Sequence, residues 1–316
     1  MIDTDTASDD AVALIMALRS PLVTVSAITV VAGNVSVEQA TRNALYTAEL
    51  CGSSVPVYTG MAKPLARELQ IADWFHGADG LGDHGYAPVS RHAEPEHAVD
   101  ALIETILQNP GIELITLGPL TNIALALQCE PRIVGNVSRC VVMGGAPCCE
   151  GNVTPAAEFN IWVDPDAARH VFVSGLTIEM VGWQLSRFEA VLNEEDIAGI
   201  LALDTDWARF TIHCNSTAAA AYHTQTGEHG IALPDPIAMA VLLQPELIID
   251  SSQCFVEIET ASELTRGMTV VDRLNVGKDV RNRSVWREAH ARATKATICW
   301  RLDVPGWKTA LMGALR

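Results

Sequence analysis

Positive charge is scarce in this chain of 316 residues. It has 21 lysine and arginine residues against 38 aspartate and glutamate residues, which gives a formal net charge of −17 at pH 7. Nucleic acids and anionic membrane surfaces are bound by clustered lysine and arginine side chains. The charge balance therefore argues against a nucleic acid or a membrane surface as partner. It also argues against a substrate held mainly through its phosphates.

Long apolar runs and paired cysteines are missing as well. No stretch approaches about 18 uninterrupted apolar residues, the minimum for a membrane-spanning helix. The eight cysteines include no CxxC pair and no zinc-like spacing, so we expect free thiols in a reducing compartment. The N-terminus lacks the basic segment that opens a secretory signal. These absences predict a cytoplasmic protein, and the 49% hydrophobic content indicates a folded one.

Negative charge, by contrast, is concentrated at the start of the chain, where four aspartates fall within eight residues. Asp3 and Asp5 are predicted to lie on one face at the end of a strand, because alternate strand residues point the same way. Asp9 and Asp10 are predicted to open a helix, where simple capping would account for one of them. Capping does not explain the other carboxylates. We interpret the cluster as a metal or acid/base site, and its oxygen ligands favour Ca²⁺ or Mg²⁺ over zinc.

Short β-branched runs alternate with helical patterns over the first two-thirds of the chain. This alternation is typical of an α/β fold with an open, mostly parallel, Rossmann-like sheet covered by helices. No repeat or linker marks a boundary, so we predict one domain over residues 1–316. Residues 61–96, rich in Gly, His, Asp and Pro, are predicted to form a mobile active-site loop, and residues 193–230 a mainly helical cap.

Polar motifs follow several predicted strands, at the edge of the sheet where ligands of such folds bind. Ala32-Gly33-Asn34 is one of them, and residues 118–122 and 143–145 hold two others, although each taken singly could be turn chemistry. The loop 151–160 carries Asn and Glu side chains suited to sugar hydroxyl groups, whereas a phosphate would call for Arg or Lys. Asp235 precedes an apolar helical pattern, either as a simple N-cap or as one more carboxylate of the site.

Taken together, these motifs resemble the calcium-dependent nucleoside hydrolases of the inosine-uridine-preferring family. The resemblance covers nearly the whole chain, and its pieces occur in the family's order: DTDTASDD, AGN, LGPLTN, VMGG, GNVTPAAEFN, DPDAA, PDPIAMA and TRGMTVVD. Each piece alone would be weak evidence, but the combination is specific. It implies an enzyme that hydrolyses the N-glycosidic bond of ribonucleosides to ribose and free base, and that assembles as a homodimer or homotetramer.

The resemblance also implies roles for individual residues. Ca²⁺ would be held by Asp5, Asp10, Asp235 and the backbone carbonyl of Leu117, with Asp5 also acting as general base. Asp3 would support these residues without contacting the substrate. His76 is similar to a family histidine on the loop over the nucleobase. The expected ribose contacts are Asp9, Asn34, Met143, Asn152, Glu158 and Asn160.

Two positions depart from the family pattern. Thr6-Ala7 replaces the usual Pro-Gly of the first motif, which leaves the carboxylates in place. Pro234 stands where many members carry a histidine that protonates the leaving base, and proline cannot donate a proton. The base could instead be activated by stacking on Trp74 or Trp183. Candidates for the missing acid are His76, His84, Tyr222 and His223, and the motif match favours His76.

Two other functions stay open on the sequence alone. The run Asp3-Thr4-Asp5-Thr6 also fits the DxDxT pattern of haloacid-dehalogenase-type phosphohydrolases, which use Mg²⁺ and would make Asp3 the nucleophile. The few lysines, however, lie in no matching context. The second alternative is a calcium- and ribose-binding relative whose hydrolytic activity is lost through Pro234. The lysines are Lys63, Lys278, Lys295 and Lys308.

Overall fold

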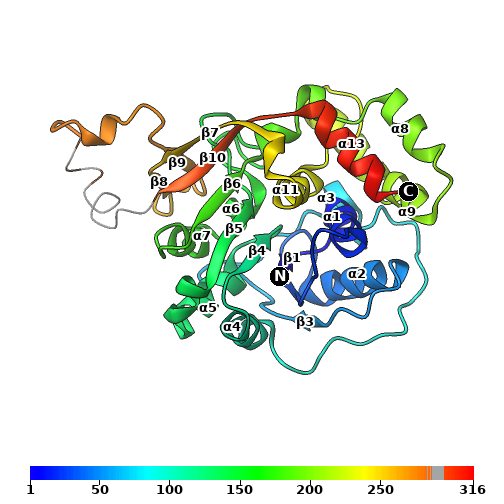
Figure 1. The fold of residues 1–316 in the computed structure, drawn as a ribbon. Helices are drawn as coiled ribbons and strands as arrows, with labels where there is room; N and C mark the ends of the chain where they lie inside the picture. The colour runs from blue at the N-terminus through cyan, green and yellow to red at the C-terminus, as the bar shows by residue number, and fades with distance from the viewer. Residues whose placement is uncertain (283, 285, 287–294) are drawn as a thin grey trace.

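One large sheet runs through the molecule in the computed structural model, which describes residues 1–282, 284, 286 and 295–316 (Figure 1). Its strand order is β3-β2-β1-β4-β5-β6-β10-β7. Neighbouring strands are parallel except β7, which runs antiparallel to β10 at the edge. The predicted open, mostly parallel sheet is therefore confirmed. The strands are β1 (Ile2–Thr4), β2 (Ile28–Val30), β3 (Val57–Thr59), β4 (Ile112–Thr116), β5 (Val137–Met143), β6 (Ile178–Val181), β7 (Ile248–Cys254) and β10 (Ala296–Leu302).

Helices cover both faces of this sheet, as parallel strands require. One face carries α1 (Ser8–Arg19), α2 (Val37–Leu50), α11 (Pro234–Leu243) and α13 (Val304–Ala314), and the other carries α4 (Ala98–Gln108), α5 (Thr121–Cys129) and α7 (Pro165–Phe172) (Figure 1). Each face has its own apolar core. Helix α1 lies between the sheet and other helices, which explains why its first ten residues are all buried.

Strands are added on opposite sides of β1 before and after β3, so the strand order switches between β1 and β4. From β1 the chain builds outward through β2 to β3, and it then returns to place β4, β5 and β6 on the other side of β1. Asp3 of β1 pairs with Thr116 of β4 in parallel register, so the loops after these two strands leave the sheet together. Ligands of open α/β sheets bind in the crevice beyond the strand ends at this point.

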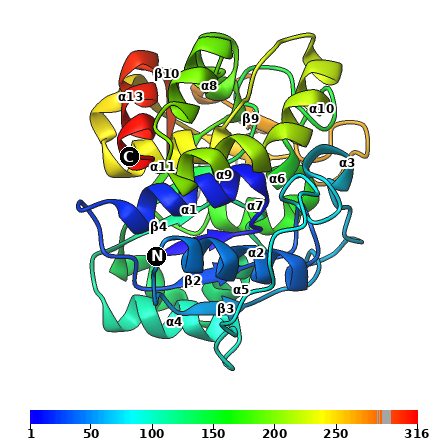
Figure 2. The ribbon, with the colours of Figure 1, turned by 90° about the vertical axis from the view of Figure 1, so that its right-hand side faces the viewer.

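Part of each segment set apart in the sequence lies beside this crevice, namely residues 72–76 of the first and residues 215–225 of the second. Residues 61–96 are largely irregular and contain one short helix, α3 (Asp73–His76). Residues 193–230 hold α8 (Glu194–Leu201), α9 (Asp206–Cys214) and α10 (Ser216–Thr226), so the predicted helical segment is confirmed (Figure 2). The mobility of the loop and the single-domain division stay predictions.

The remaining elements are short. Strands β8 (Val256–Ile258) and β9 (Thr269–Val271) pair antiparallel with each other, outside the large sheet. Helix α6 spans Phe159–Val163. The 3-10 turns are η1 (Pro131–Asn136), η2 (Trp183–Ser186), η3 (Phe188–Ala190), η4 (Pro245–Leu247) and η5 (Val276–Lys278).

Two absences predicted from the sequence can be compared with the structure. Among the described residues, no helix combines the length and the apolar character needed to cross a bilayer. All eight cysteines lie in the described part of the chain, and each is a free thiol.

Candidate active site

Carboxylates from three chain segments meet at the crevice. Asp5 follows β1, Asp9 and Asp10 stand in the first turn of α1, and Asp235 stands in the first turn of α11. Helices α1 and α11 pack side by side, so two helix N-termini bring their partial positive charge to the same place (Figure 2). One carboxylate oxygen from each of Asp9, Asp10 and Asp235 lies within 4.8 Å of the other two.

Asp5 is fully buried and held in a narrow space. Its Oδ2 accepts a hydrogen bond of 2.6 Å from the backbone N–H of Asn34, while its Oδ1 has no partner among the described residues. A Cβ atom on Gly33 would lie 2.1 Å from Oδ2, and one on Gly118 would lie 2.8 Å from Oδ1. Glycine is therefore needed at both positions, which gives the AGN and LGP motifs a physical reason.

The other aspartates of the first motif have different surroundings. Asp10 accepts hydrogen bonds from Thr4 Oγ1 (2.5 Å) and from the backbone N–H of Ala7 (2.9 Å). Asp3 Oδ1 accepts from Thr29 Oγ1 (2.6 Å) and Asn122 Nδ2 (2.9 Å) within the sheet. Asp3 is thus enclosed behind the site, a position that suits support and not nucleophilic attack.

The carboxylates are electrostatically costly without a cation. Burial raises the pKa of Asp3 to about 7 and that of Asp9 to about 7, with the charge of Asp10 adding to the second shift. Burial, and then the charges of neighbouring aspartates, also raise the pKa of Asp5 and Asp235 well above the usual range. The Oδ1 atoms of Asp5 and Asp9 are buried without a hydrogen bond within the described ranges.

This cluster fits a metal ion. Its ligand atoms are oxygens only, two of them are unpartnered, and the lining of the adjacent pocket, as far as the structure describes it, includes no lysine or arginine. Buried carboxylates at such density are stabilised by a cation among them, and oxygen donors suit a hard one. The site is therefore a candidate metal centre.

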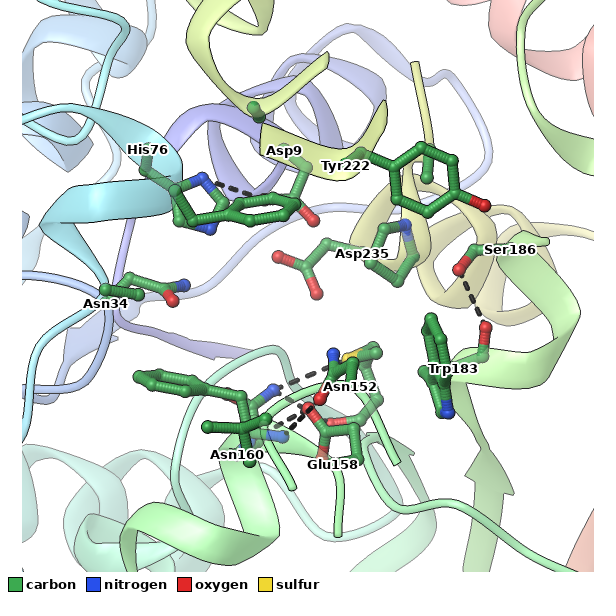
Figure 3. A pocket seen from close by; sticks show the side chains of 18 of the residues that line it. Asp9, Asn34, His76, Asn152, Glu158, Asn160, Trp183, Ser186, Tyr222 and Asp235 are labelled. Atoms are coloured by element: carbon green, nitrogen blue, oxygen red, sulfur yellow. Dashed lines mark hydrogen bonds and ion pairs between the residues drawn. The ribbon is translucent and has the colours of Figure 1, made fainter. Parts of the chain in front are cut away.

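A pocket opens directly beside the carboxylates, and Asp9 and Asp235 form part of its wall. Figure 3 shows Asp235 near its middle, Asn152, Glu158 and Asn160 together on one side, and Trp183, Ser186 and Tyr222 along another. Asp5 and Asp10 are not part of the lining and lie buried behind it. The structure brings the other predicted residues to the pocket wall: Asp9, Asn34, His76, Leu117, Met143, Asn152, Glu158, Asn160 and Asp235.

The polar wall is held by its own hydrogen bonds. Glu158 caps α6, with Oε1 accepting from the N–H of Asn160 (2.9 Å) and Oε2 from the N–H of Gly145 (2.7 Å). Asn160 Nδ2 donates to the Leu117 carbonyl (2.8 Å) and lies 3.3 Å from the Met143 carbonyl. A carbonyl oxygen has two lone pairs, so Leu117 keeps one for a cation.

Two hydrogen bonds hold the loop that carries Asn152. Its Oδ1 accepts a hydrogen bond of 2.9 Å from the N–H of Phe159, and its backbone carbonyl accepts one from the Gln225 side chain of α10. The polar wall and the helical segment 193–230 are thus connected at the rim of the pocket. Burial raises the pKa of Glu158 within this wall.

The candidates for a leaving-group acid separate clearly by position. His84 hydrogen-bonds Ser216, and His223 is exposed and contacts the Glu228 carbonyl; neither lines the pocket. Tyr222 lines it, but its hydroxyl donates to the Glu228 carboxylate, and burial together with this bond raises its pKa. His76 lines the pocket as well, and burial lowers its pKa to about 3, so its imidazole is neutral.

Two aromatic side chains named from the sequence also reach the pocket. Trp183 is buried, with its indole N–H donating to the Glu150 carbonyl at 2.7 Å, whereas Trp74 is 56% exposed. Sequence reasoning missed several lining residues because no motif after a strand marks them. They lie on α3, η2 and the segment around α10: Phe75, Ser186, Asn215, Ala218 and Gln225.

Comparisons with known proteins agree with this geometry. Residues 1–308 match the family described as inosine-uridine preferring nucleoside hydrolase. The chain is 42% identical to the pyrimidine-specific ribonucleoside hydrolase RihA of Shewanella sp. strain ANA-3, over 100% of this chain and 95% of that protein.

Solved structures are similar over the full length too. A plant nucleoside hydrolase superposes with a TM-score of 0.92 at 31% identity, covering 99% of this chain and 97% of the other. A purine-preferring ribonucleoside hydrolase from Gardnerella vaginalis gives a TM-score of 0.87 at 30% identity, covering 99% and 98%. With the matched motifs at the crevice, these findings show that the chain belongs to the inosine-uridine preferring nucleoside hydrolase family.

Proposed function

We propose that this protein hydrolyses the N-glycosidic bond of ribonucleosides, adding water to give ribose and the free base. The proposal rests mainly on one observation: the pocket beside the buried carboxylate cluster has different kinds of side chain on its two sides. Amide and carboxylate groups that suit sugar hydroxyls stand on one side, and aromatic groups that suit a nucleobase stand on the other. The described lining offers no lysine or arginine for a phosphate, which disfavours the phosphohydrolase alternative.

The metal in this proposal is Ca²⁺, held by Asp5, Asp10, Asp235 and the Leu117 carbonyl. The dense oxygen set supports a hard cation, and the family resemblance supports calcium among the hard cations. A bound Ca²⁺ would polarise the attacking water and hold ribose hydroxyl groups. Asp9, whose oxygen lies in the same cluster, would contact both the ion's surroundings and the ribose.

Asp5 is the proposed general base. Its Oδ2 is fixed by the Asn34 N–H, so its unpartnered Oδ1 is the atom available to take the proton of the water. As the water oxygen bonds to C1′, the C1′–N bond breaks and its electron pair leaves with the base. The sugar passes through an oxocarbenium-like state, and the surrounding carboxylates stabilise its positive charge.

The remaining predicted residues hold the substrate in this account. Asn34, Asn152, Glu158 and Asn160 would bind ribose hydroxyls from a wall whose hydrogen bonds are already in place. Such preorganisation lowers the entropic part of the barrier. On the base side, His76 offers a neutral imidazole N–H, and Trp74 and Trp183 offer ring faces.

A nucleoside panel tests the proposal. Inosine, adenosine, guanosine, uridine and cytidine are assayed for ribose release, each with its 2′-deoxy analogue. We expect turnover of at least one ribonucleoside and weak turnover of its deoxy form. The reason is that the 2′-hydroxyl is among the ribose hydroxyl groups proposed to bind Ca²⁺. Saturable binding without turnover of any nucleoside would favour the non-enzymatic alternative, and release of phosphate from phosphomonoesters would favour the phosphohydrolase.

We also propose a homodimer or homotetramer in the cytoplasm. Apolar side chains exposed along residues 264–280 support self-association, including Leu274 at 83% and Val280 at 77% exposure. The eight free thiols support a reducing compartment. Sedimentation velocity would measure the assembly, and a monomer at micromolar concentration would contradict it.

A further inference from the structure

We propose that Ser8 is a positioning residue for His76. The Ser8 hydroxyl donates a hydrogen bond to His76 Nδ1, and this bond fixes the imidazole in the tautomer that carries its proton on Nε2, facing the pocket. The inference rests on the proposed function, because the group that Nε2–H would meet is the leaving nucleobase. It gives a role to a residue of the DTDTASDD motif that does not line the pocket.

The contact joins two parts of the chain that are distant in sequence. Ser8 is the first residue of α1 and is fully buried, and its Oγ lies 2.9 Å from Nδ1 of His76 in α3. Within the described residues, Oγ has no second hydrogen-bond partner. A buried hydroxyl proton left without an acceptor costs more than an unused lone pair. Ser8 is therefore the donor and Nδ1 the acceptor.

The tautomer of His76 follows from this direction. A neutral imidazole has one donor and one acceptor nitrogen, so an accepting Nδ1 places the proton on Nε2. No described residue forms a hydrogen bond with Nε2, although the ring lines the pocket. Asp9 Oδ1 lies 3.9 Å from Nδ1, which is too far for a hydrogen bond. Ser8, and not Asp9, thus decides the tautomer.

The orientation of the ring is fixed by packing as well. The His76 ring meets the ring of Phe75 edge to face, with centroids 4.9 Å apart and planes inclined by 61°. Both rings belong to the short helix α3, and the Ser8 bond is the contact that ties His76 to the first turn of α1, beside Asp9 and Asp10. Ser8 therefore links the carboxylate cluster to the nucleobase side of the pocket, where Figure 3 shows His76 beside Asp9.

This link matters because Pro234 offers no donor. As the C1′–N bond breaks, negative charge develops on the base, and a fixed N–H aimed at it becomes a stronger hydrogen-bond donor in the transition state than in the ground state. Nε2–H supplies that donor only while Nδ1 is occupied by Ser8. Without the Ser8 hydroxyl, the ring can adopt the other tautomer and turn a lone pair toward the base.

Kinetics with two leaving groups provide the first test. Ser8→Ala should lower kcat for ribonucleosides about 10-fold, a fraction of the effect of losing a general acid, with KM changed less than twofold. It should leave 4-nitrophenyl riboside unaffected, because 4-nitrophenolate departs without a donor. Ser8→Thr, which keeps the hydroxyl, should restore turnover. Ser174→Ala removes a serine hydroxyl bonded to the Val171 carbonyl far from the pocket and should change neither substrate.

The outcomes of this assay are distinct. A loss confined to nucleosides and reversed by threonine supports the proposal. An equal loss on both substrates would mean that Ser8 acts through general structure, and an unchanged nucleoside rate would mean that it does not act on His76. Either result overturns the proposal.

A second measurement does not depend on activity, so it separates failure of this inference from failure of the proposed function. In ¹H–¹⁵N correlation spectra of protein labelled with ¹⁵N-histidine, the signal lost in His76→Gln identifies His76. We expect a protonated Nε2 and an unprotonated Nδ1, with averaged nitrogen shifts in Ser8→Ala. A proton on Nδ1 in the unchanged protein would overturn the proposal.

Discussion

At the scale of single residues, most side chains of the site stand after a strand or in the first turn of a helix. Asp5, Asn34 and Leu117 follow β1, β2 and β4, and Asp235 opens α11. These positions are readable from sequence because strand ends and helix starts carry local signals. Asp3 belongs to the same motif, yet its bonds to Thr29 and Asn122 direct it into the sheet, and only the resemblance indicated this difference.

His76 is the residue for which substitution is most informative. We expect His76→Ala to lower turnover of ribonucleosides about 10²-fold, the scale of a lost proton-donating or hydrogen-bonding group at the leaving base. The reason is that His76 is the candidate whose ring nitrogen is open to the pocket. Steady-state kinetics on the best substrate of the panel measures the effect.

A matched control lies on the same loop. His84 hydrogen-bonds Ser216 and does not line the pocket, so His84→Ala should stay within about twofold of the unchanged protein. Near-normal turnover in His76→Ala, or an equal loss in His84→Ala, would contradict the assigned role.

The histidines also show where sequence reasoning ends at this scale. His76, His84 and His223 are all polar residues in segments near the site, and no local pattern separates them. For His76 and His84 the separation depends on partners far along the chain, Ser8 and Ser216, whereas His223 contacts the nearby Glu228 carbonyl. Non-local contacts of this kind are visible only in the folded structure.

At the scale of elements, the loops after β1, β2 and β4 form one packed unit. The Asp5 side chain fits between Gly33 and Gly118, and Asn122 at the start of α5 bonds both Asp3 and the Val30 carbonyl. The geometry of each loop therefore depends on the other two. A change of one atom in this unit should alter the metal centre.

Gly33→Ala tests that dependence. The added methyl group would lie 2.1 Å from Asp5 Oδ2 and 2.7 Å from Pro119 Cδ, so Asp5 or its loop must move. We expect calcium affinity and turnover to fall by at least about tenfold, and the free energy of unfolding by about 1–3 kcal/mol, as for an overpacked core. Isothermal titration with Ca²⁺ and denaturant unfolding measure the two effects.

Gly135→Ala is the matched control, because a Cβ there meets no atom within 4 Å. It should leave both quantities unchanged. Normal calcium affinity in Gly33→Ala would mean that Asp5 is not a ligand.

Most elements before residue 243 could be predicted from local pattern, whereas strand β7 after it depends on pairing within the sheet. The apolar spacing at residues 98–108, for example, is typical of a helix, and α4 spans these residues. By contrast, β7 has the polar sequence IIDSSQC and is exposed at the edge, so it lacks the apolar signal of a strand. It is a strand because β10 pairs with it antiparallel, and β10 in turn inserts beside β6. Such pairing depends on strands that are distant in sequence, so no local pattern predicts it.

At the scale of the whole molecule, part of the acidic excess is buried, as the cluster of aspartates at the crevice. The formal net charge of −17 counts the enclosed aspartates at the crevice, whose pKa values are raised by burial. Raised carboxyl pKa values in the folded state mean that the metal-free protein loses stability from these groups as the pH rises from about 4 to about 7. His76 and the N-terminal amine, with lowered pKa values, act in the opposite direction.

Calcium binding should therefore depend on pH. Because the ligand carboxylates must be ionised, the ion competes with protons for them and binds more tightly as the pH rises. We expect the increase in Tm caused by 1 mM Ca²⁺, relative to metal-free buffer, to grow steadily from pH 5 to pH 8. Differential scanning fluorimetry at constant ionic strength measures it, and a calcium effect that is constant over this range would contradict the account.

In the proposed reaction, the carboxylate cluster and a bound cation together hydrolyse ribonucleosides. Ribose release from the best nucleoside of the panel, followed through chelation and the return of Ca²⁺, tests it most directly, with Asp5→Asn assayed in parallel. We expect chelator to abolish release, Ca²⁺ to restore it, and Asp5→Asn to stay at least about 10²-fold slower with Ca²⁺ present. Ribose release that persists in chelator, or that Asp5→Asn retains in full, would contradict it.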